Sequence, residues 1–317
     1  MTTTDTAAPP VAERRGAAAD AVVTVRDLVK RYGPHEAVRG VSFDVRRGEL
    51  FGLLGTNGAG KTTTVEILQG LRHPTAGHVR VAGLDPATQG DRLRRRIGAQ
   101  LQDAALPDRL RVGEALRLFA SLHPSPRPIG ELVEEWDLGR LLRRPFAGLS
   151  GGERQRLFVA LALVSRPEVV FLDELTQNLD PAGRRRTWDV VRRVRDAGTT
   201  VVLVTHDVEE AERLCDRLVV MHRGRVVADG SPASIVEALG GEATVRFTDA
   251  GLDVRTLRRV PGVHRVQRHG PEVRVTGAGP VLAHLGAHLV AAGRPPLDLR
   301  IERPSLEDRF VALTEED

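Results

Sequence analysis

A glycine-rich loop between a predicted strand and a predicted helix constrains the fold of this chain more than any other feature. Glu49 to Leu54 is a short apolar run, Gly55 to Gly60 is the loop, and Lys61 to Leu71 has apolar residues at helical spacing. Further along, the predicted strands Val169 to Leu172 and Thr200 to Thr205 alternate with predicted helices. Such alternation predicts an α/β fold with a parallel sheet covered by helices on both faces.

The sequence outside this core predicts a tail, an insertion and a second domain. Residues 1–20 are polar, alanine-rich and interrupted by proline, which is typical of a disordered tail. Residues 21–238 form the main domain, with a helical insertion at about residues 103–150. Residues 241–317 have a β-α-β-β-α-β order, which predicts a small ferredoxin-like α+β domain.

The loop itself, Gly55 to Thr62, matches the phosphate-loop pattern G-x-x-x-x-G-K-[ST] in full. Its glycines let successive backbone N–H groups face a β-phosphate, Lys61 reaches the β- and γ-oxygens, and the Thr62 hydroxyl ligates Mg²⁺. Lys61 is one of only two lysines in a chain rich in arginine, and a phosphate loop requires the compact ammonium. Strand, loop and helix together predict a nucleotide phosphate site.

A second glycine turn lies in Leu149 to Arg156, LSGGERQR. A serine and two glycines before a charged helical run place backbone N–H groups at a helix N-terminus. Such a terminus favours an anion, because the helix dipole and the amides act in the same direction. The chain therefore has two turns suited to phosphate, roughly ninety residues apart, and one evident nucleotide.

Two acidic residues follow the apolar strand Val169 to Leu172. Asp173 ends the strand and is placed beside a metal ion. Glu174 comes next and is placed to polarise a water that attacks the γ-phosphate. The alternative is a charged pair that merely closes a buried strand, and the phosphate loop upstream favours the catalytic interpretation.

Two further polar residues are candidates for the same site. His206 follows the predicted strand Val201 to Thr205, whose carboxyl end faces the γ-phosphate in a sheet of this kind, so a sensor or transition-state role is predicted. A simple strand-end histidine is the alternative. Gln102, after Ile97 and Gly98, is a candidate for contact with the metal and the attacking water.

Composition disfavours several other classes of protein. The formal net charge is only +4 and aromatic residues make up 3% of the chain, which leaves few stacking platforms for bases, so we expect no nucleic-acid partner. No stretch approaches the roughly 18 apolar residues of a membrane span, and the first twenty residues have no apolar region typical of a signal peptide. Cys215 is the only cysteine, which excludes an intrachain disulfide and fits a reducing cytoplasm.

Taken together, these motifs resemble the ATP-binding cassette (ABC) ATPases in order and spacing over about residues 22–235. In that family's terms, Gly55 to Thr62 is the P-loop, Gln102 the glutamine loop and Leu149 to Glu153 the signature. Val169 to Glu174 is the Walker B strand and His206 the switch histidine. The resemblance implies a P-loop NTPase cassette with an N-terminal antiparallel β part, which binds and hydrolyses ATP with Mg²⁺.

The resemblance also assigns residues to the site. Tyr32, the only tyrosine, occupies the place of the ring that stacks on adenine. Glu174, His206 and Gln102 are implied to be catalytic, and Thr62, Gln102 and Asp173 to bind the metal. The residues implied to bind the nucleotide are Tyr32, Gly55, Thr56, Asn57, Gly58, Ala59, Gly60, Lys61, Thr62, Thr63, Ser150, Gly151, Gly152 and Asp180.

In this family two cassettes dock head-to-tail. The signature residues Ser150, Gly151 and Gly152 of one subunit are therefore implied to contact the γ-phosphate held by Lys61 of the other. One chain with one P-loop and one signature is expected to work as a dimer, most simply a homodimer.

The C-terminal segment Pro304 to Phe310 resembles the one that closes drug-resistance-type ABC ATPases, which pair with separate ABC-2-type permeases. It implies a subunit that powers an exporter of drugs, antibiotics or other amphipathic compounds, held at the cytoplasmic face of the membrane by its permease. The alternative is a soluble ABC ATPase that acts on ribosomes or nucleic acid. A GTPase switch is disfavoured because the chain has no N-K-x-D guanine signature.

Three positions depart from the family pattern. Thr56 and Leu175 stand where proline is common, and Asn178 replaces a small residue of the D-loop, Asn178 to Asp180. None of these changes removes a ligand, an acid, a base or a phosphate donor. Hydrolysis remains the expectation, and Asn178 puts the coupling between subunits in doubt.

Overall fold

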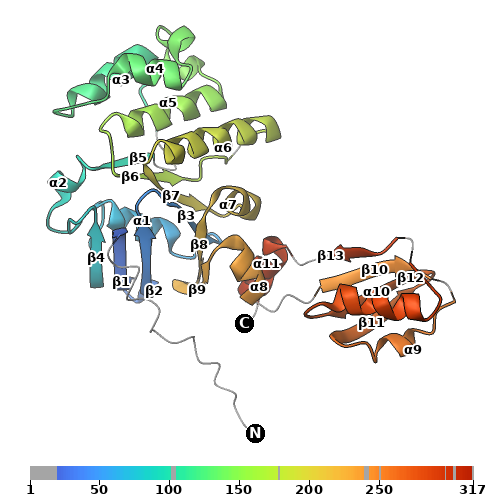
Figure 1. The fold of residues 1–317 in the computed structure, drawn as a ribbon. Coiled ribbons are helices and arrows are strands. Elements are labelled where there is room, and N and C mark those ends of the chain that lie inside the picture. Colours follow the sequence, from blue (N-terminus) through green and yellow to red (C-terminus); the bar gives the residue numbers. More distant parts are fainter. Residues whose placement is uncertain are drawn as a thin grey trace. The chain divides into compact units, whose positions relative to one another are not determined.

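The computed structural model describes residues 20–100, 105–177, 179–238, 243–249, 251–296, 298–302 and 305–315 (Figure 1). The chain forms two compact units, Met1–Asp229 and Gly230–Asp317. Each unit has a hydrophobic core of its own. The boundary expected near residue 240 lies one helix later than this division, because helix α8 (Pro232–Ala238) contacts helix α11 (Leu306–Glu315) in the second unit.

An antiparallel sheet of order β2-β1-β4 begins the first unit. Its strands are β1 (Ala21–Tyr32), β2 (His35–Arg46) and β4 (Ala76–Val81). Strands β1 and β2 continue to the tight turn where Tyr32 pairs with His35. This long hairpin brings Tyr32 to the same hollow as the P-loop residues.

A six-stranded sheet of order β5-β6-β7-β3-β8-β9 forms the centre of the unit, and its first five strands are parallel. Its strands are β3 (Leu50–Gly55), β5 (Ile97–Gln100), β6 (Val169–Asp173), β7 (Thr200–Thr205), β8 (Arg217–His222) and β9 (Arg225–Gly230). Strands β3, β6 and β7 are buried along their whole length, as expected for a sheet covered on both faces. The predicted fold class is confirmed.

Helices and one aromatic pair connect this central sheet to its surroundings. The helices are α1 (Lys61–Leu68), α2 (Gly90–Leu93), α6 (Pro181–Asp196) and α7 (Val208–Leu214). Helix α1 contacts β2, β3 and β4, whereas α6 and α7 contact β7. Phe43 of β2 stacks on Phe51 of β3 with ring centroids 5.2 Å apart, which joins the two sheets in one core.

The predicted helical insertion is present within the described residues. It contains α3 (Val112–Ser121), α4 (Ile129–Glu135), the 3₁₀ turns η3 (Gly139–Leu141) and η4 (Phe146–Gly148), and leads into α5 (Gly151–Leu163). Helix α3 packs against α4 and α5. In Figure 1, α3 and α4 lie beyond α5, on its side away from the strands.

The second unit has the β-α-β-β-α-β order that the sequence predicts. After α8, its elements are β10 (Ala243–Thr248), α9 (Val254–Leu257), β11 (Val263–His269), β12 (Glu272–Gly277), α10 (Val281–Ala291) and β13 (Arg300–Glu302), followed by α11. The sheet order is β11-β12-β10-β13 with every pair antiparallel, the ferredoxin-like arrangement. Helix α9 is a short helix that begins after Asp253, whose side chain caps it.

Among the residues that the structure describes, no helix is both long enough and apolar enough to span a bilayer.

Candidate functional site: a P-loop and a separate glycine turn

The P-loop joins β3 to α1, where the sequence places it. Gly58 and Gly60 have φ angles of +81° and +95°, which L-residues rarely adopt. A Cβ atom at Gly60 would also lie 2.4 Å from the Ala37 carbonyl oxygen. No side chain caps α1, whose N-cap is Gly60. The loop therefore offers main-chain N–H groups at a helix N-terminus, an arrangement that binds phosphate.

Lys61 folds over this loop. Its Nζ donates hydrogen bonds to the carbonyl oxygens of Gly55 at 2.8 Å and Thr56 at 3.1 Å, and the residue is only 5% exposed. Burial lowers the pKa of Lys61, while the nearby carboxylates of Glu174 and Asp173 act in the opposite direction. A desolvated ammonium held at the loop suits the phosphate oxygens of a nucleotide.

A hollow of about 430 Å³ lies against the loop. Tyr32 and His35 line it from the β1–β2 hairpin, Lys61 and Thr62 from the start of α1, and Glu174 from the end of β6. The Tyr32 ring is 39% exposed, and its centroid is 5.1 Å from Lys30 Nζ and 5.7 Å from Arg72 Cζ. The hollow thus has the aromatic ring of Tyr32 on the β1–β2 hairpin and the polar side chains of Lys61 and Thr62 at the start of α1.

Asp173 and Glu174 end β6 beside β7. Asp173 is buried, and Glu174 has a φ angle of +49°, a strained backbone conformation for a residue with a side chain. Its N–H donates to the Val204 carbonyl oxygen at 2.9 Å, and its Oε1 lies 3.0 Å from His206 Nδ1. The carboxylate is 7% exposed and the imidazole 43%. The structure therefore brings together the two predicted catalytic residues that it describes.

The donors predicted for a metal are of the type that Mg²⁺ accepts. Thr62 lies in the first turn of α1 and Asp173 is the last residue of β6, so an alcohol and a carboxylate oxygen come from neighbouring elements. Hard oxygen donors of this kind, completed by phosphate and water, suit Mg²⁺. The third predicted donor, Gln102, lies outside the described residues.

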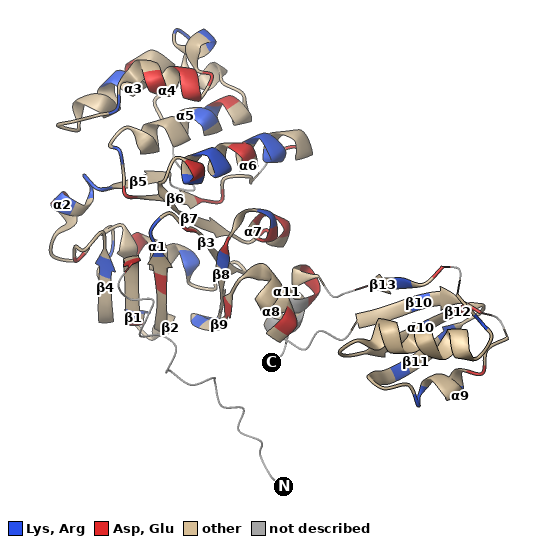
Figure 2. Cartoon of the chain, viewed as in Figure 1, with Lys and Arg blue, Asp and Glu red and all other residues tan. Residues whose placement is uncertain are grey.

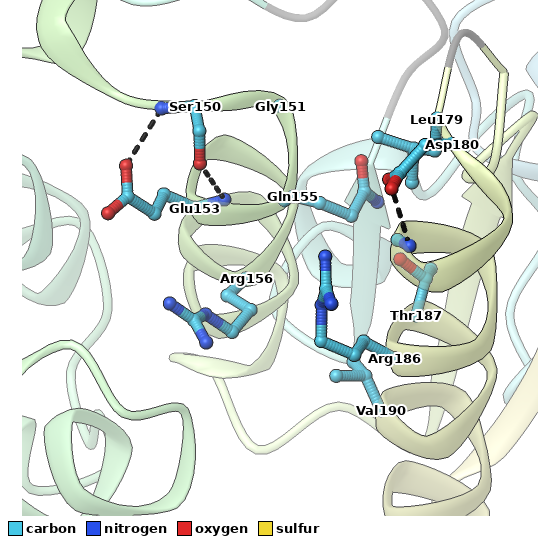
Figure 3. A pocket seen from close by; sticks show the side chains of 12 residues that line it. Ser150, Gly151, Glu153, Gln155, Arg156, Leu179, Asp180, Arg186, Thr187 and Val190 are labelled. Carbon is cyan, nitrogen blue, oxygen red and sulfur yellow. Dashed lines mark hydrogen bonds between the residues drawn. The ribbon is translucent and has the colours of Figure 1, made fainter.

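Ser150 begins α5 and forms a capping box with Glu153 (Figure 3). The Ser150 hydroxyl accepts a hydrogen bond from the Glu153 N–H at 3.4 Å, and Glu153 Oε2 accepts one from the Ser150 N–H at 2.8 Å. Those bonds, with Arg144 3.0 Å from Glu153 Oε1, lower the pKa of Glu153. The N–H groups of Ser150 and Glu153 are therefore already hydrogen-bonded to side chains within the turn.

A second hollow, of about 540 Å³, lies between α5 and α6 beside this turn. Asp180 caps α6 by accepting a hydrogen bond from the Gly183 N–H at 3.0 Å. Gln155 of α5 and Arg186 of α6 point into the groove between the two helices (Figure 3). Among the described residues, none lines both this hollow and the one at the P-loop. Within one chain, the two phosphate-suited turns therefore belong to different surfaces.

Among the residues that line these hollows but were not predicted from the sequence are His35, Gln155 and Arg186. His35 lines the first because it pairs with Tyr32 across the turn between β1 and β2, and a Gly-Pro turn between two alternating segments is the signal that points to it. Gln155 and Arg186 line the second because α5 and α6 pack together, which no local pattern indicates.

The positions that depart from the family pattern are tolerated where the structure describes them. Thr56 contributes its carbonyl oxygen to the Lys61 ammonium, which any residue can do. Leu175 is buried in the core after Glu174. Asn178 lies outside the described residues.

Arginines that could suggest a nucleic-acid surface alternate with acidic residues along α6 (Figure 2). Arg184 lies 2.9 Å from Asp207, and Arg192 lies 3.2 Å from Asp189. Arg94 likewise pairs with Asp91 at α2. These clusters are therefore partly neutralised by ion pairs, as on an ordinary solvated helix face.

Comparison with known proteins agrees with this geometry. A family model described as ABC transporter matches residues 38–177. Daunorubicin resistance ATP-binding protein DrrA3 of Streptomyces coeruleorubidus is 38% identical over 308 residues, 94% of this chain and 98% of that protein. Nod factor export ATP-binding protein I of Burkholderia orbicola is 40% identical over 302 residues, 93% and 97% of the two chains.

Solved structures show the same cassette. An ATP-binding subunit of an ABC transporter matches with a TM-score of 0.63 and 31% identity over 69% of this chain and 93% of that one. The protein cbiO1 from Clostridium perfringens, part of the ABC transporter complex cbiONQ, matches with a TM-score of 0.60 and 27% identity over 69% and 91%.

The chain therefore belongs to the family of ABC transporter ATP-binding proteins. It binds ATP, and it is an ATPase whose hydrolysis is coupled to transport. The match with DrrA3 extends over nearly the whole chain, including the second unit. The resemblance drawn from the motifs is confirmed.

Proposed function

We propose that this chain hydrolyses ATP as one half of a dimer that drives a separate ABC-2-type permease. The main support for a dimer is that the P-loop and the Ser150 turn, both suited to phosphate, line different hollows of one chain. A second copy would bring its Ser150 turn to the nucleotide held at Lys61. The Gly151 and Gly152 amides of that turn and its dipole favour the γ-phosphate.

We propose the following roles within that composite site. Lys61, the loop amides and Thr63 bind the phosphates, and Thr62, Asp173 and Gln102 hold Mg²⁺, which supplies Lewis-acid stabilisation of the phosphate charge when bound. Glu174 accepts the proton of the attacking water, and its 3.0 Å contact with His206 Nδ1 fixes where that carboxylate lies. Asp180, at the start of α6, belongs to the surface that meets the second subunit.

The cargo is proposed from the relatives. One is named for daunorubicin resistance and another for Nod factor export, and both align with this chain almost from end to end. We infer that this chain powers export of drugs, antibiotics or other amphipathic compounds, at the cytoplasmic face of the membrane and through its permease.

Isolation of the tagged chain from its own cells tests the permease. After mild detergent extraction, we expect it to copurify with a protein of about six apolar segments, each roughly 20 residues long. A matched sample extracted without detergent should lack that protein. Recovery with ribosomes or nucleic acid in both samples would contradict the proposal and favour a soluble role.

Tyr32→Ala tests the proposed adenine stacking. Loss of the ring should weaken ATP affinity by about 1–3 kcal/mol, if energies of base stacking on aromatic side chains apply here. Tyr32→Phe keeps the ring and should bind ATP as the wild type does. Calorimetric titration with ATP measures both, and unchanged affinity in Tyr32→Ala would refute the stacking role.

A further inference from the structure

Glu210 is a fully buried carboxylic acid on α7, four residues after His206. Its side chain is 0% exposed, and no described basic side chain forms an ion pair with it. A carboxyl group in such surroundings is rare unless it has hydrogen-bonding partners. Burial raises the pKa of Glu210, while the nearby side chains of Thr205, Thr176 and Trp188 act in the opposite direction.

The three side chains that surround the Glu210 carboxyl group belong to three segments of the ATPase site. Thr176 lies two residues after Glu174, and Thr205 is the residue before His206. Trp188 lies on α6, the helix that Asp180 caps, and its Nε1 donates a hydrogen bond to Glu210 Oε1 at 3.3 Å. One buried carboxyl group therefore lies beside the segments that carry both members of the Glu174–His206 pair, and is hydrogen-bonded to α6.

The main chain around Glu210 makes a parallel connection. Its N–H donates to Asp207 Oδ1 at 3.0 Å, which caps α7. The other carboxylate oxygen of Asp207 lies 2.9 Å from Arg184 on α6. The helix that follows His206 is thus bound to α6 through Asp207 at its start and through Glu210 inside the protein, in addition to the hydrogen bond that Arg192 donates to the Arg213 carbonyl oxygen.

We infer that Glu210 is a positioning residue for ATP hydrolysis, which holds the segment after Glu174, the end of β7 and α6 in the arrangement that keeps Glu174 against His206. This inference rests on the proposed roles of Glu174 and His206. Glu210 itself lies away from the P-loop hollow and does not line it. Its effect is therefore expected on turnover and not on nucleotide binding.

Glu210→Leu and Glu210→Gln separate positioning from mere packing. Leucine removes the buried carboxyl and the acceptor of the Trp188 hydrogen bond at similar volume, and burial of its apolar side chain offsets part of the cost of that lost bond. Glutamine keeps an acceptor for Trp188 and a polar group for the threonines. Glu209→Gln is the matched control, because Glu209 is the exposed neighbour on the same helix, paired with Arg213.

We expect Glu210→Leu to lower kcat by about tenfold or more, since small displacements of catalytic groups have effects of this size. Its KM for ATP should match that of the wild type, because Glu210 does not line the P-loop hollow. Glu210→Gln and Glu209→Gln should retain most of the turnover. The measurements are steady-state ATPase rates across ATP concentration, with thermal unfolding of each full-length variant.

Three results would overturn the inference. The first is a wild-type kcat in Glu210→Leu. The second is a loss of kcat that merely accompanies losses of ATP affinity and unfolding temperature. The third is a Glu210→Gln variant that is as slow as Glu210→Leu. If Glu210→Leu does not fold, Trp188→Phe keeps an aromatic side chain and removes the Nε1 donor together with part of the indole, and unchanged kcat there would count against the inference. Wild-type turnover in Glu174→Gln would instead overturn the proposed catalytic role.

Discussion

Glu174→Gln is expected to bind ATP normally and to lose nearly all hydrolysis, with turnover lower by about 10²–10⁴-fold. Glutamine has the same shape as glutamate, so it should leave the fold and the nucleotide hollow intact, but it cannot accept the proton of the attacking water. The strained backbone of Glu174 and its 3.0 Å contact with His206 fix the position of this side chain. Phosphate release measures the loss, and equilibrium ATP binding measures the retained affinity.

A matched control comes from the same substitution at an exposed carboxylate. Glu209→Gln makes an identical chemical change on α7, away from the P-loop hollow, and should hydrolyse ATP at the wild-type rate. Wild-type turnover in Glu174→Gln would remove Glu174 from the catalytic role and leave the general base to be found elsewhere in the hollow.

Lys61→Ala is expected to have the second large effect, on both ATP binding and turnover. Its buried ammonium is the only lysine at the P-loop hollow, and alanine leaves the phosphate oxygens without it. Removal of one preorganised donor from such a site costs about 10²–10³-fold in rate. ATP titration and steady-state hydrolysis should both show the loss.

Lys61→Arg sharpens this test because it keeps the charge. The planar guanidinium is larger than an ammonium and cannot donate to the Gly55 and Thr56 carbonyl oxygens in the same geometry. We expect it to be impaired as well. Wild-type binding and turnover in Lys61→Ala would contradict the proposed phosphate contact, whereas full activity in Lys61→Arg would show that charge alone suffices.

Much of the fold follows from local pattern, and the exceptions have identifiable causes. The buried strands β3, β6 and β7 are continuous apolar runs, so the parallel core could be predicted. Strand β9 was not predicted, because it is the last strand of the sheet and only every second residue of it is even half-buried. Helix α6 begins at Pro181, because Asp180 caps it and proline favours the first helical position.

The site was predictable to the extent that it is local in sequence. The P-loop, the end of β6 and the end of β7 each carry their own signal, and the parallel sheet brings Glu174 and His206 together. The buried contacts of Glu210 with Trp188, Thr176 and Thr205 arise from packing of α6 and α7 on the sheet. No motif in the sequence marks them.

The proposed dimer is tested most directly by whether the Ser150 turn of one chain closes on ATP held by another chain. With ATP and Mg²⁺, light scattering of Glu174→Gln should give the mass of two chains. Adding Gly152→Asp should return it to one chain, because the new carboxylate would face the γ-phosphate. The fold should tolerate this change, since no other group lies within 4 Å of a Cβ at Gly152 and an acidic residue suits a first helical turn.

Gly130→Asp is the matched control, since Gly130 is the second residue of α4 and also has open space around it. Glu174→Gln with Gly130→Asp should keep the mass of two chains. We therefore expect the mass of one chain only when Gly152 is changed. Two chains with Gly152→Asp, or one chain in Glu174→Gln itself with ATP bound, would contradict this expectation.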